Sequence, residues 1–149
     1  QHILTHKKLA FHPLATRELC LYVGKNNPLY ERSEVRFSEL PKLRFVSGAR
    51  DYFSMEHHLE TISLGIISRE MLNNVICTNS EYALIHALSA TDLCGMGVKF
   101  LTNQYEGHGI KTLTVKDCEP FLTVGYVTSE QHILSSPCVE FIEKLREKL

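Results

Sequence analysis

Short apolar runs alternate along this chain with segments of helical periodicity, and this alternation limits the folds open to it. The pattern predicts strands at residues 18–23, 43–46, 74–78, 98–101, 111–115 and 121–127. It predicts helices at residues 81–93, at residues 136–149, and around the spaced apolar residues Met55, Leu59 and Ile62. Strands that alternate with helices are typical of an α/β fold with a largely parallel sheet.

The C-terminal helix is the clearest of these elements. Ser136 is expected to cap it, and Pro137 suits the first helical position. Glu140 and Lys144 have the spacing of an i,i+4 ion pair. One helix face is apolar and carries Cys138, Phe141, Ile142, Leu145 and Leu149.

The remaining segments are predicted to be connections. Residues 30–43 are polar and charged, with Leu40 and Leu43 as apolar anchors, and residues 102–109 form a polar loop. Gly95-Met96-Gly97 follows a helix and precedes a strand, which is the reverse of the order in a dinucleotide-binding loop. We interpret these glycines as a helix stop and a point of close backbone approach.

Composition excludes several classes of protein. The 149 residues include 16 Lys and Arg against 17 Asp and Glu, so the chain carries no basic surface for nucleic acid by itself. No apolar run approaches the roughly 20 residues of a membrane span, and the first residues lack the apolar core of a secretion signal. The five cysteines are odd in number and widely spaced, which favours a reducing, cytoplasmic location.

No sequence motif indicates a metal, a cofactor or a catalytic nucleophile. There is no Cys-x-x-Cys pair and no Gly-x-Ser-x-Gly elbow. Cys77 and Cys94 stand in apolar runs and are interpreted as small core residues. The sequence therefore predicts no metal site, no cofactor and no enzyme.

Two predicted strands end in polar residues that lead directly into helices. One end is Ser47-Gly48-Ala49-Arg50 and the other is Thr78-Asn79-Ser80. Hydroxyl and amide side chains beside the N–H groups of a helix start suit a carboxylate or another small anion, and Arg50 can add a bidentate contact. Plain helix capping explains either segment alone. On neighbouring parallel strands, the two ends would line one cleft.

Taken in order, several segments resemble the effector-binding domain of LysR-type bacterial transcriptional regulators. Asn27-Pro28-Leu29 after the first strand resembles that family's His-Pro-Leu, with Asn27 in place of the His. Ser38-Glu39-Leu40 resembles the family's short "aspartate-leucine" helix, with Glu39 in place of the Asp. Thr102 stands where the family usually has a Pro after the strand that ends at Leu101. The other matching segments are 14–23, 82–101, 126–128 and 134–142.

The resemblance implies a two-lobed α/β domain like a type 2 periplasmic binding protein, with a small organic or anionic effector between the lobes. The chain would be mostly the second lobe, formed by about residues 16–115. Residues from about 120 to 149 would be the crossing strand and C-terminal helix of the first lobe, whose first part this sequence is expected to lack. Such domains self-associate, and DNA is bound by a separate N-terminal winged helix-turn-helix that this sequence lacks. The family's contacts correspond to Ala15 and Thr16 and to the Thr78–Ser80 segment; Ala15 replaces what can be a charged contact.

Two alternatives remain open from the sequence. A solute-binding protein lobe would share the fold, although five cysteines count against an oxidising compartment. A small α/β enzyme would need a cysteine with a depressed pKa beside a histidine. In every case the apolar face of the last helix must find a partner, and a second copy of the chain is the expected one.

Overall fold

The computed structural model describes residues 8–48, 72–99, 102–120, 122–129 and 133–149. The chain divides into two compact units. The terminal unit consists of Gln1–Arg17 and Leu122–Leu149, and the central unit consists of Glu18–Phe121. The predicted helix around Met55, Leu59 and Ile62 lies outside the described residues. Within the described ranges, no helix is long and apolar enough to cross a lipid bilayer.

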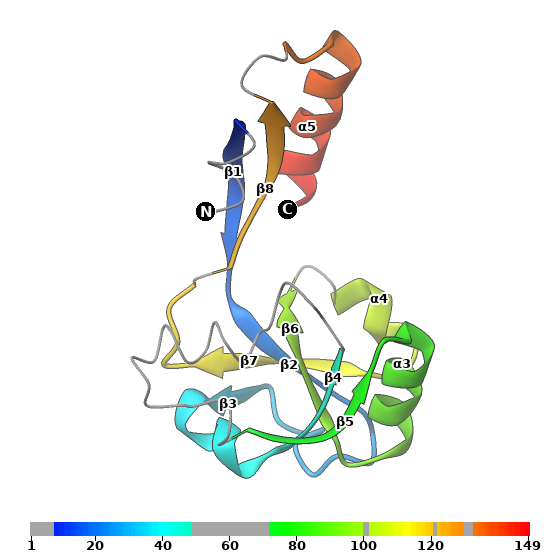
Figure 1. Ribbon diagram of the computed structural model, residues 1–149. Helices are drawn as coiled ribbons and strands as arrows, with labels where there is room; N and C mark the ends of the chain where they lie inside the picture. Colours follow the sequence, from blue (N-terminus) through cyan, green and yellow to red (C-terminus); the bar gives the residue numbers. More distant parts are fainter. Residues whose placement is uncertain (1–7, 49–71, 100–101, 121, 130–132) are drawn as a thin grey trace. The chain divides into compact units, whose positions relative to one another are not determined.

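The central unit is built on a six-stranded sheet with the order β3-β7-β2-β6-β4-β5 (Figure 1). Strand β2 pairs antiparallel with both of its neighbours, and every other pairing is parallel. Five strands therefore run in one direction and β2 alone opposes them, so the predicted α/β fold with a largely parallel sheet is confirmed. The strands are β2 (Leu19–Val23), β3 (Glu34–Arg36), β4 (Arg44–Gly48), β5 (Asn73–Thr78), β6 (Cys94–Val98) and β7 (Lys111–Lys116).

Strand β2 is buried on both faces of the sheet along its whole length. Its side chains alternate between two hydrophobic clusters because successive residues of a strand point to opposite faces. Leu19, Leu21 and Val23 enter one cluster, which also contains Phe45. Cys20 and Tyr22 enter the other. The central unit thus has a core on each side of one strand.

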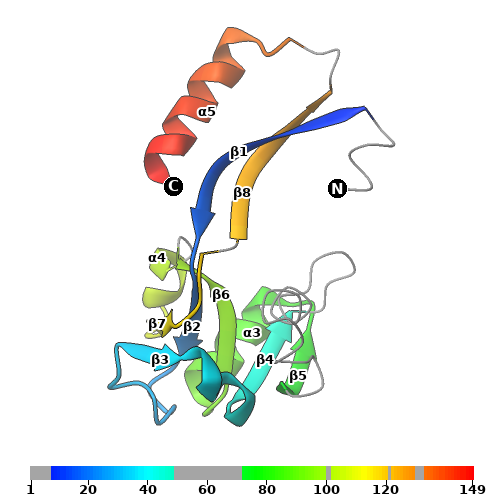
Figure 2. The ribbon, with the colours of Figure 1, turned by 90° about the vertical axis from the view of Figure 1, so that its left-hand side faces the viewer.

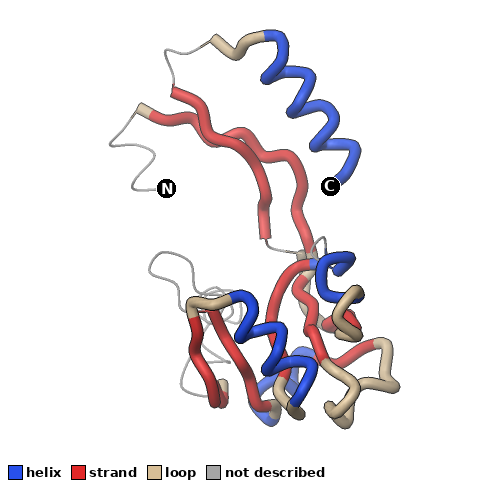
Figure 3. The backbone as a smooth tube through the Cα atoms, turned by 90° about the vertical axis from the view of Figure 1, so that its right-hand side faces the viewer, coloured by secondary structure: helices blue, strands red, loops and turns tan. Residues whose placement is uncertain are grey.

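The two faces of the sheet are covered by different elements. Helix α3 (Glu81–Ala90) lies against the sheet (Figure 3). Its Ala87 and Leu88 belong to the cluster that contains Tyr22. The 3-10 helix η1 (Phe37–Lys42) precedes β4 (Figure 2). Its Leu40 is buried in the opposite cluster. Residues 30–43 are therefore more than a connection, since they also contain β3. Hydrophobic periodicity does not predict these two elements, because β3 has only three residues and η1 contains Pro41.

Two predicted boundaries near the glycine pair are wrong. Helix α3 ends at Ala90, where the Thr91 hydroxyl donates to the carbonyl of Ala87 at 2.6 Å, so the glycines do not stop it. They lie inside β6, which begins at Cys94 rather than at residue 98. The predicted loop at 102–109 begins with a short helix, α4 (Thr102–Glu106).

The interpretation of Cys77 as a core residue is wrong, because its strand β5 lies at the edge of the sheet that the described residues form. Val75 and Ile76 are 43% and 40% exposed, and Cys77 is exposed rather than a core residue. An apolar run has the same sequence pattern at an edge and at the centre, because only the strand order decides which strand lacks a neighbour.

The terminal unit contains β1 (Leu9–Arg17), β8 (Leu122–Ser129) and α5 (Ser136–Lys148). The two strands pair antiparallel, and His12 Nε2 lies 2.8 Å from the Thr128 hydroxyl across them. The N-cap of α5 is Ser135 rather than Ser136. The predicted ion pair is present, with 2.6 Å between Lys144 Nζ and Glu140 Oε1.

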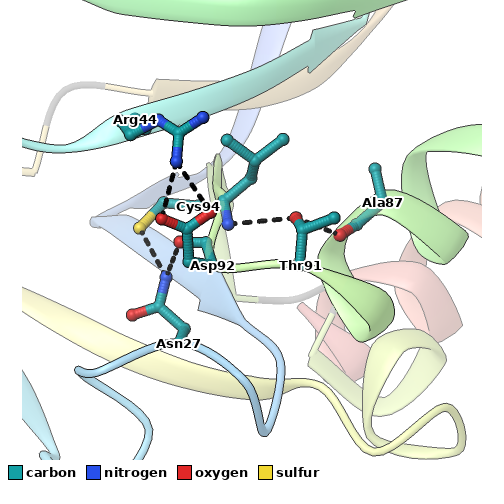
Figure 4. A network of polar contacts seen from close by, with 7 residues as sticks. Asn27, Arg44, Ala87, Thr91, Asp92 and Cys94 are labelled. Atoms are coloured by element: carbon teal, nitrogen blue, oxygen red, sulfur yellow. Dashed lines mark hydrogen bonds and ion pairs between the residues drawn. The ribbon is translucent and has the colours of Figure 1, made fainter.

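The buried side chain of Asn27 ties together two turns of the central unit (Figure 4). Its amide nitrogen donates to the backbone oxygen of Asp92 and lies 3.3 Å from Cys94 Sγ. Its amide oxygen accepts a hydrogen bond from the Leu29 N–H at 2.8 Å. The Asp92 carboxylate in turn binds Arg44, with 2.8 Å between Nη1 and Oδ2. The turn after β2 is thereby fixed to the turn before β6.

Replacing Asn27 with alanine should destabilise the protein by about 1–3 kcal/mol, because buried backbone groups lose their partner. The matched control is Asn26→Ala, since Asn26 is exposed and its one amide donates to Ala90 at 3.1 Å. The control should change the free energy of unfolding by no more than about 0.5 kcal/mol. Urea denaturation measures both variants, and equal effects would contradict the structural role of Asn27.

Hydrogen bonds to the Glu39 carboxylate stabilise the start of η1. The Glu39 carboxylate accepts two hydrogen bonds from the Arg32 guanidinium, at 2.9 and 3.1 Å, and one from the Arg36 backbone N–H at 2.8 Å. These contacts, the Arg32 hydrogen bonds first, lower the pKa of Glu39 from 4.5 to about 2. The ionised form is therefore favoured in the folded chain.

This lowered pKa predicts a pH dependence of stability. The contribution of Glu39 should be complete above pH 4.5, its ordinary pKa, and should be lost as the pH falls through about 2. Glu39→Gln should be less stable than the wild type at neutral pH, and the difference should shrink over that window and in high salt. Denaturation across the pH range tests this, with Glu31→Gln as the control for loss of one exposed charge. A difference that is independent of pH would contradict it.

Candidate functional site

A pocket of about 240 Å³ lies in the central unit at the C-terminal ends of β4 and β5. The two strands are parallel neighbours, with Gly48 paired to Thr78, so their ends reach the same edge of the sheet. Strand β5 leads from there into α3 (Figure 1). The pocket is lined by Gly48, Thr78, Asn79, Ser80, Glu81, Leu84 and Tyr105.

The start of α3 is organised by hydroxyl groups. The Ser80 hydroxyl accepts a hydrogen bond from the Ala83 N–H at 3.3 Å, and the Thr78 hydroxyl accepts one from the Ser80 N–H at 3.1 Å. Ser80 is therefore the N-cap of the helix, as its residue type predicts. The first N–H groups of a helix have no partner within it, and the positive end of the helix dipole favours an anion there.

Helices α3 and α4 meet beside this pocket. The Gln104 side chain in α4 donates a hydrogen bond to the Glu81 carboxylate in the first turn of α3. The next residue of α4, Tyr105, is 8% exposed and reaches the core below. Helix α4 is therefore fixed both to the start of α3 and to the hydrophobic core.

Tyr105 packs on Tyr22 of the central strand, with ring centroids 4.3 Å apart. The Tyr22 ring lies across Gly97, its diagonal neighbour on β6, and its hydroxyl donates to the Val98 carbonyl at 2.6 Å. A Cβ at Gly97 would stand 2.3 Å from Tyr22 Cε2, so only glycine leaves room for the ring. The sequence predicts a close backbone approach at these glycines, and the structure instead places an aromatic side chain against Gly97.

The structure brings together four of the predicted site residues: Gly48, Thr78, Asn79 and Ser80. Ser47 pairs with Cys77 and is not among the described residues that line the pocket. Ala15 and Thr16 belong to β1 in the terminal unit, where Thr16 lies 3.4 Å from the Thr123 hydroxyl. Arg50 lies outside the described residues. Ligand binding by all of these residues stays a prediction.

Three pocket residues were not foreseen. Leu84 follows Ser80 by four residues, so helical periodicity could have indicated it, and Glu81 is the residue directly after Ser80. Tyr105 comes from the segment predicted to be a loop, and only the fold brings it to α3. The sequence does not indicate that Tyr105 and the start of α3 line one pocket, because they lie far apart along the chain.

The buried cysteines do not have the properties of an activated nucleophile. Burial raises the pKa of the Cys20 thiol to about 12 and raises the pKa of Cys94. A nucleophilic cysteine needs the opposite shift. All five cysteines are free thiols. Among the residues that the structure places, no three His, Cys, Asp or Glu side chains gather around a common point as metal ligands would.

Comparison with known proteins agrees with the fold. The family model of the LysR substrate binding domain matches residues 1–149. A comparison with curated proteins gives no match. The structure is similar to the effector binding domain of QuiR in complex with shikimate, with 14% identity and a TM-score of 0.67 over 93% of this chain and 64% of that one.

Two further solved structures are similar. One is the C-terminal domain of a probable LysR family regulator from Rhodococcus sp. RHA1, with 18% identity and a TM-score of 0.65 over 93% and 67% of the two chains. The other is full-length CbnR with its target DNA, with 10% identity and a TM-score of 0.68 over 97% and 49%. This chain thus spans 64% of the QuiR domain and about half of full-length CbnR.

The fold defines a class, the α/β domains of the type 2 periplasmic-binding-protein kind. Within that class, the chain belongs to the LysR substrate-binding-domain family. The family resemblance of the sequence is confirmed over its whole length.

Gly97→Ala should destabilise the protein by about 1–3 kcal/mol, because the added methyl group forces the Tyr22 ring from its place. The control is Gly107→Ala, where a Cβ would meet nothing within 4 Å. Chemical denaturation measures both variants, and a neutral Gly97→Ala would contradict the packing of Tyr22 against β6.

Proposed function

We propose that this chain is the small-molecule sensing module of a LysR-type transcriptional regulator, and that its effector binds in the pocket at the ends of β4 and β5. The observation that carries the proposal is the meeting of Gly48 with Thr78, Asn79 and Ser80 at one sheet edge. In open α/β sheets, ligands bind outside the carboxyl ends of strands. The family match over residues 1–149 supports the same function.

We assign the central unit to the second lobe of the effector domain, and the strand and helix of the terminal unit to the first. The division of the chain at residues 18 and 121 supports this assignment. Thr16 and Ala15 then lie on the strand that enters the central unit, with Arg50 as a further candidate contact. A small organic or anionic effector would meet the hydroxyls and the positive end of α3.

The mechanism we propose is a population shift. A ligand that binds one arrangement of the domain more tightly favours that arrangement and so biases an attached DNA-binding domain. The protein would act without catalysis, as a self-associating cytoplasmic regulator, and would contact DNA only through a helix-turn-helix domain. The CbnR structure contains its target DNA, and the QuiR domain contains shikimate, a small carboxylic acid.

The two alternatives have less support. A cysteine-dependent enzyme is disfavoured by the raised pKa values of Cys20 and Cys94. A solute-binding lobe shares the fold, but the family match favours the regulator. Thiol-labelling rates equal to those of free cysteine at the exposed Cys77 and Cys138 would also count against the enzyme.

Binding can be tested by NMR with a set of small carboxylic and hydroxy acids that includes shikimate. We expect at least one compound to shift the backbone amide signals of Thr78, Asn79 and Ser80. Asn79→Ala should weaken that binding about fivefold or more, in line with the loss of a hydrogen bond. It should change stability by no more than about 0.5 kcal/mol, because Asn79 is exposed.

The matched control is Asn26→Ala, which removes the same side chain from a turn that does not line the pocket. It should bind the compound as the wild type does. Amide shifts that lie away from the pocket, or normal binding by Asn79→Ala, would contradict the proposed site. Ser80 is a poorer choice for this test because it also caps α3.

A further inference from the structure

The residues that line the pocket are of two chemical kinds. Thr78, Asn79, Ser80 and Glu81 offer hydroxyl, amide and carboxylate groups. Leu84 is apolar, and Tyr105 is the one aromatic residue among the described lining residues. A ligand in this pocket can therefore meet both hydrogen-bonding groups and an aromatic ring.

Tyr105 is held in place more firmly than a surface aromatic residue would be. It is 8% exposed and packs at 31° to the ring of Tyr22, which is itself 2% exposed. Gly97 leaves space for the ring of Tyr22, and the Tyr22 hydroxyl donates a hydrogen bond to the Val98 carbonyl. The neighbouring Gln104 bonds to Glu81 and holds α4 against α3. A pre-positioned aromatic ring gives contact area at a small cost in conformational entropy.

We infer that Tyr105 is a specificity-determining residue of this pocket, and that it selects small ligands with a planar, unsaturated ring and an oxygen-bearing substituent. The inference rests on the proposed function, because it presumes that the pocket binds a small molecule. It goes further in naming the shape and chemistry of the ligand. Offset or edge-on contacts between π-systems add to simple burial of apolar area, so a flat ring gains more from Tyr105 than a puckered ring of the same size.

The test compares benzamide with cyclohexanecarboxamide. Both carry the same neutral amide, which can bond to the hydroxyl and amide groups of the lining. The saturated ring has the larger apolar surface, so burial alone would favour cyclohexanecarboxamide. The wild-type chain should instead bind benzamide about two- to tenfold more tightly. Amide shifts of Thr78, Asn79 and Ser80 in an NMR titration report both affinities.

Two variants of Tyr105 complete the test. Tyr105→Phe keeps the ring and should keep the preference for benzamide. Tyr105→Leu should lose that preference and bind the two amides equally, or cyclohexanecarboxamide more tightly. Nuclear Overhauser contacts between the benzamide ring and Tyr105 in the wild type give a measurement that does not depend on how well a variant folds.

The outcomes separate this inference from the function on which it rests. If both amides shift the pocket signals but the wild type shows no preference, the role of Tyr105 is wrong and the pocket remains a binding site. A preference that survives in Tyr105→Leu overturns the inference in the same way. If neither amide nor any of the carboxylic acids shifts those signals, the proposed function fails as well.

Discussion

The complete burial of strand β2 is the constraint on which the rest of the structure depends. Its five residues supply both hydrophobic clusters of the central unit, three from one face and two from the other. Burying one large apolar side chain is worth about 1.5–3 kcal/mol, so this strand alone joins two cores into one unit. A strand without exposed residues needs partners on both edges, and β6 and β7 provide them in antiparallel register.

The requirement for close packing around β2 extends outward to the pocket. Tyr22 needs the space that Gly97 leaves on β6, and its ring then supports Tyr105 at the pocket wall. Asn27, in the turn after β2, donates a hydrogen bond to the backbone oxygen of Asp92, in the turn before β6. This bond fixes the end of β2 to the start of β6. The residues proposed to meet the ligand thus sit on rigid parallel strands and on a capped helix, which keeps them in place without the ligand.

Different physical signals account for what could be predicted and what could not. The strand ends at Gly48 and Thr78–Ser80 follow apolar runs and precede helices, so their common position follows from a parallel sheet. The exposure of Cys77 could not be predicted, because an edge strand and a central strand share one pattern. Helix α4 is only five residues long and has no periodicity to detect, so Tyr105 was hidden with it.

The sequence by itself determined the α/β class, the family, the apolar strands and the polar segments at their ends, because these depend on local composition and spacing along the chain. Only the tertiary structure decided the strand order, the reversed direction of β2 and the role of Gly97 as space for the Tyr22 ring. It also decided that Tyr105 lines the same pocket as residues some twenty-five positions earlier. These features depend on which segments become neighbours when apolar area is buried, and neighbours in space leave no periodic mark on the sequence.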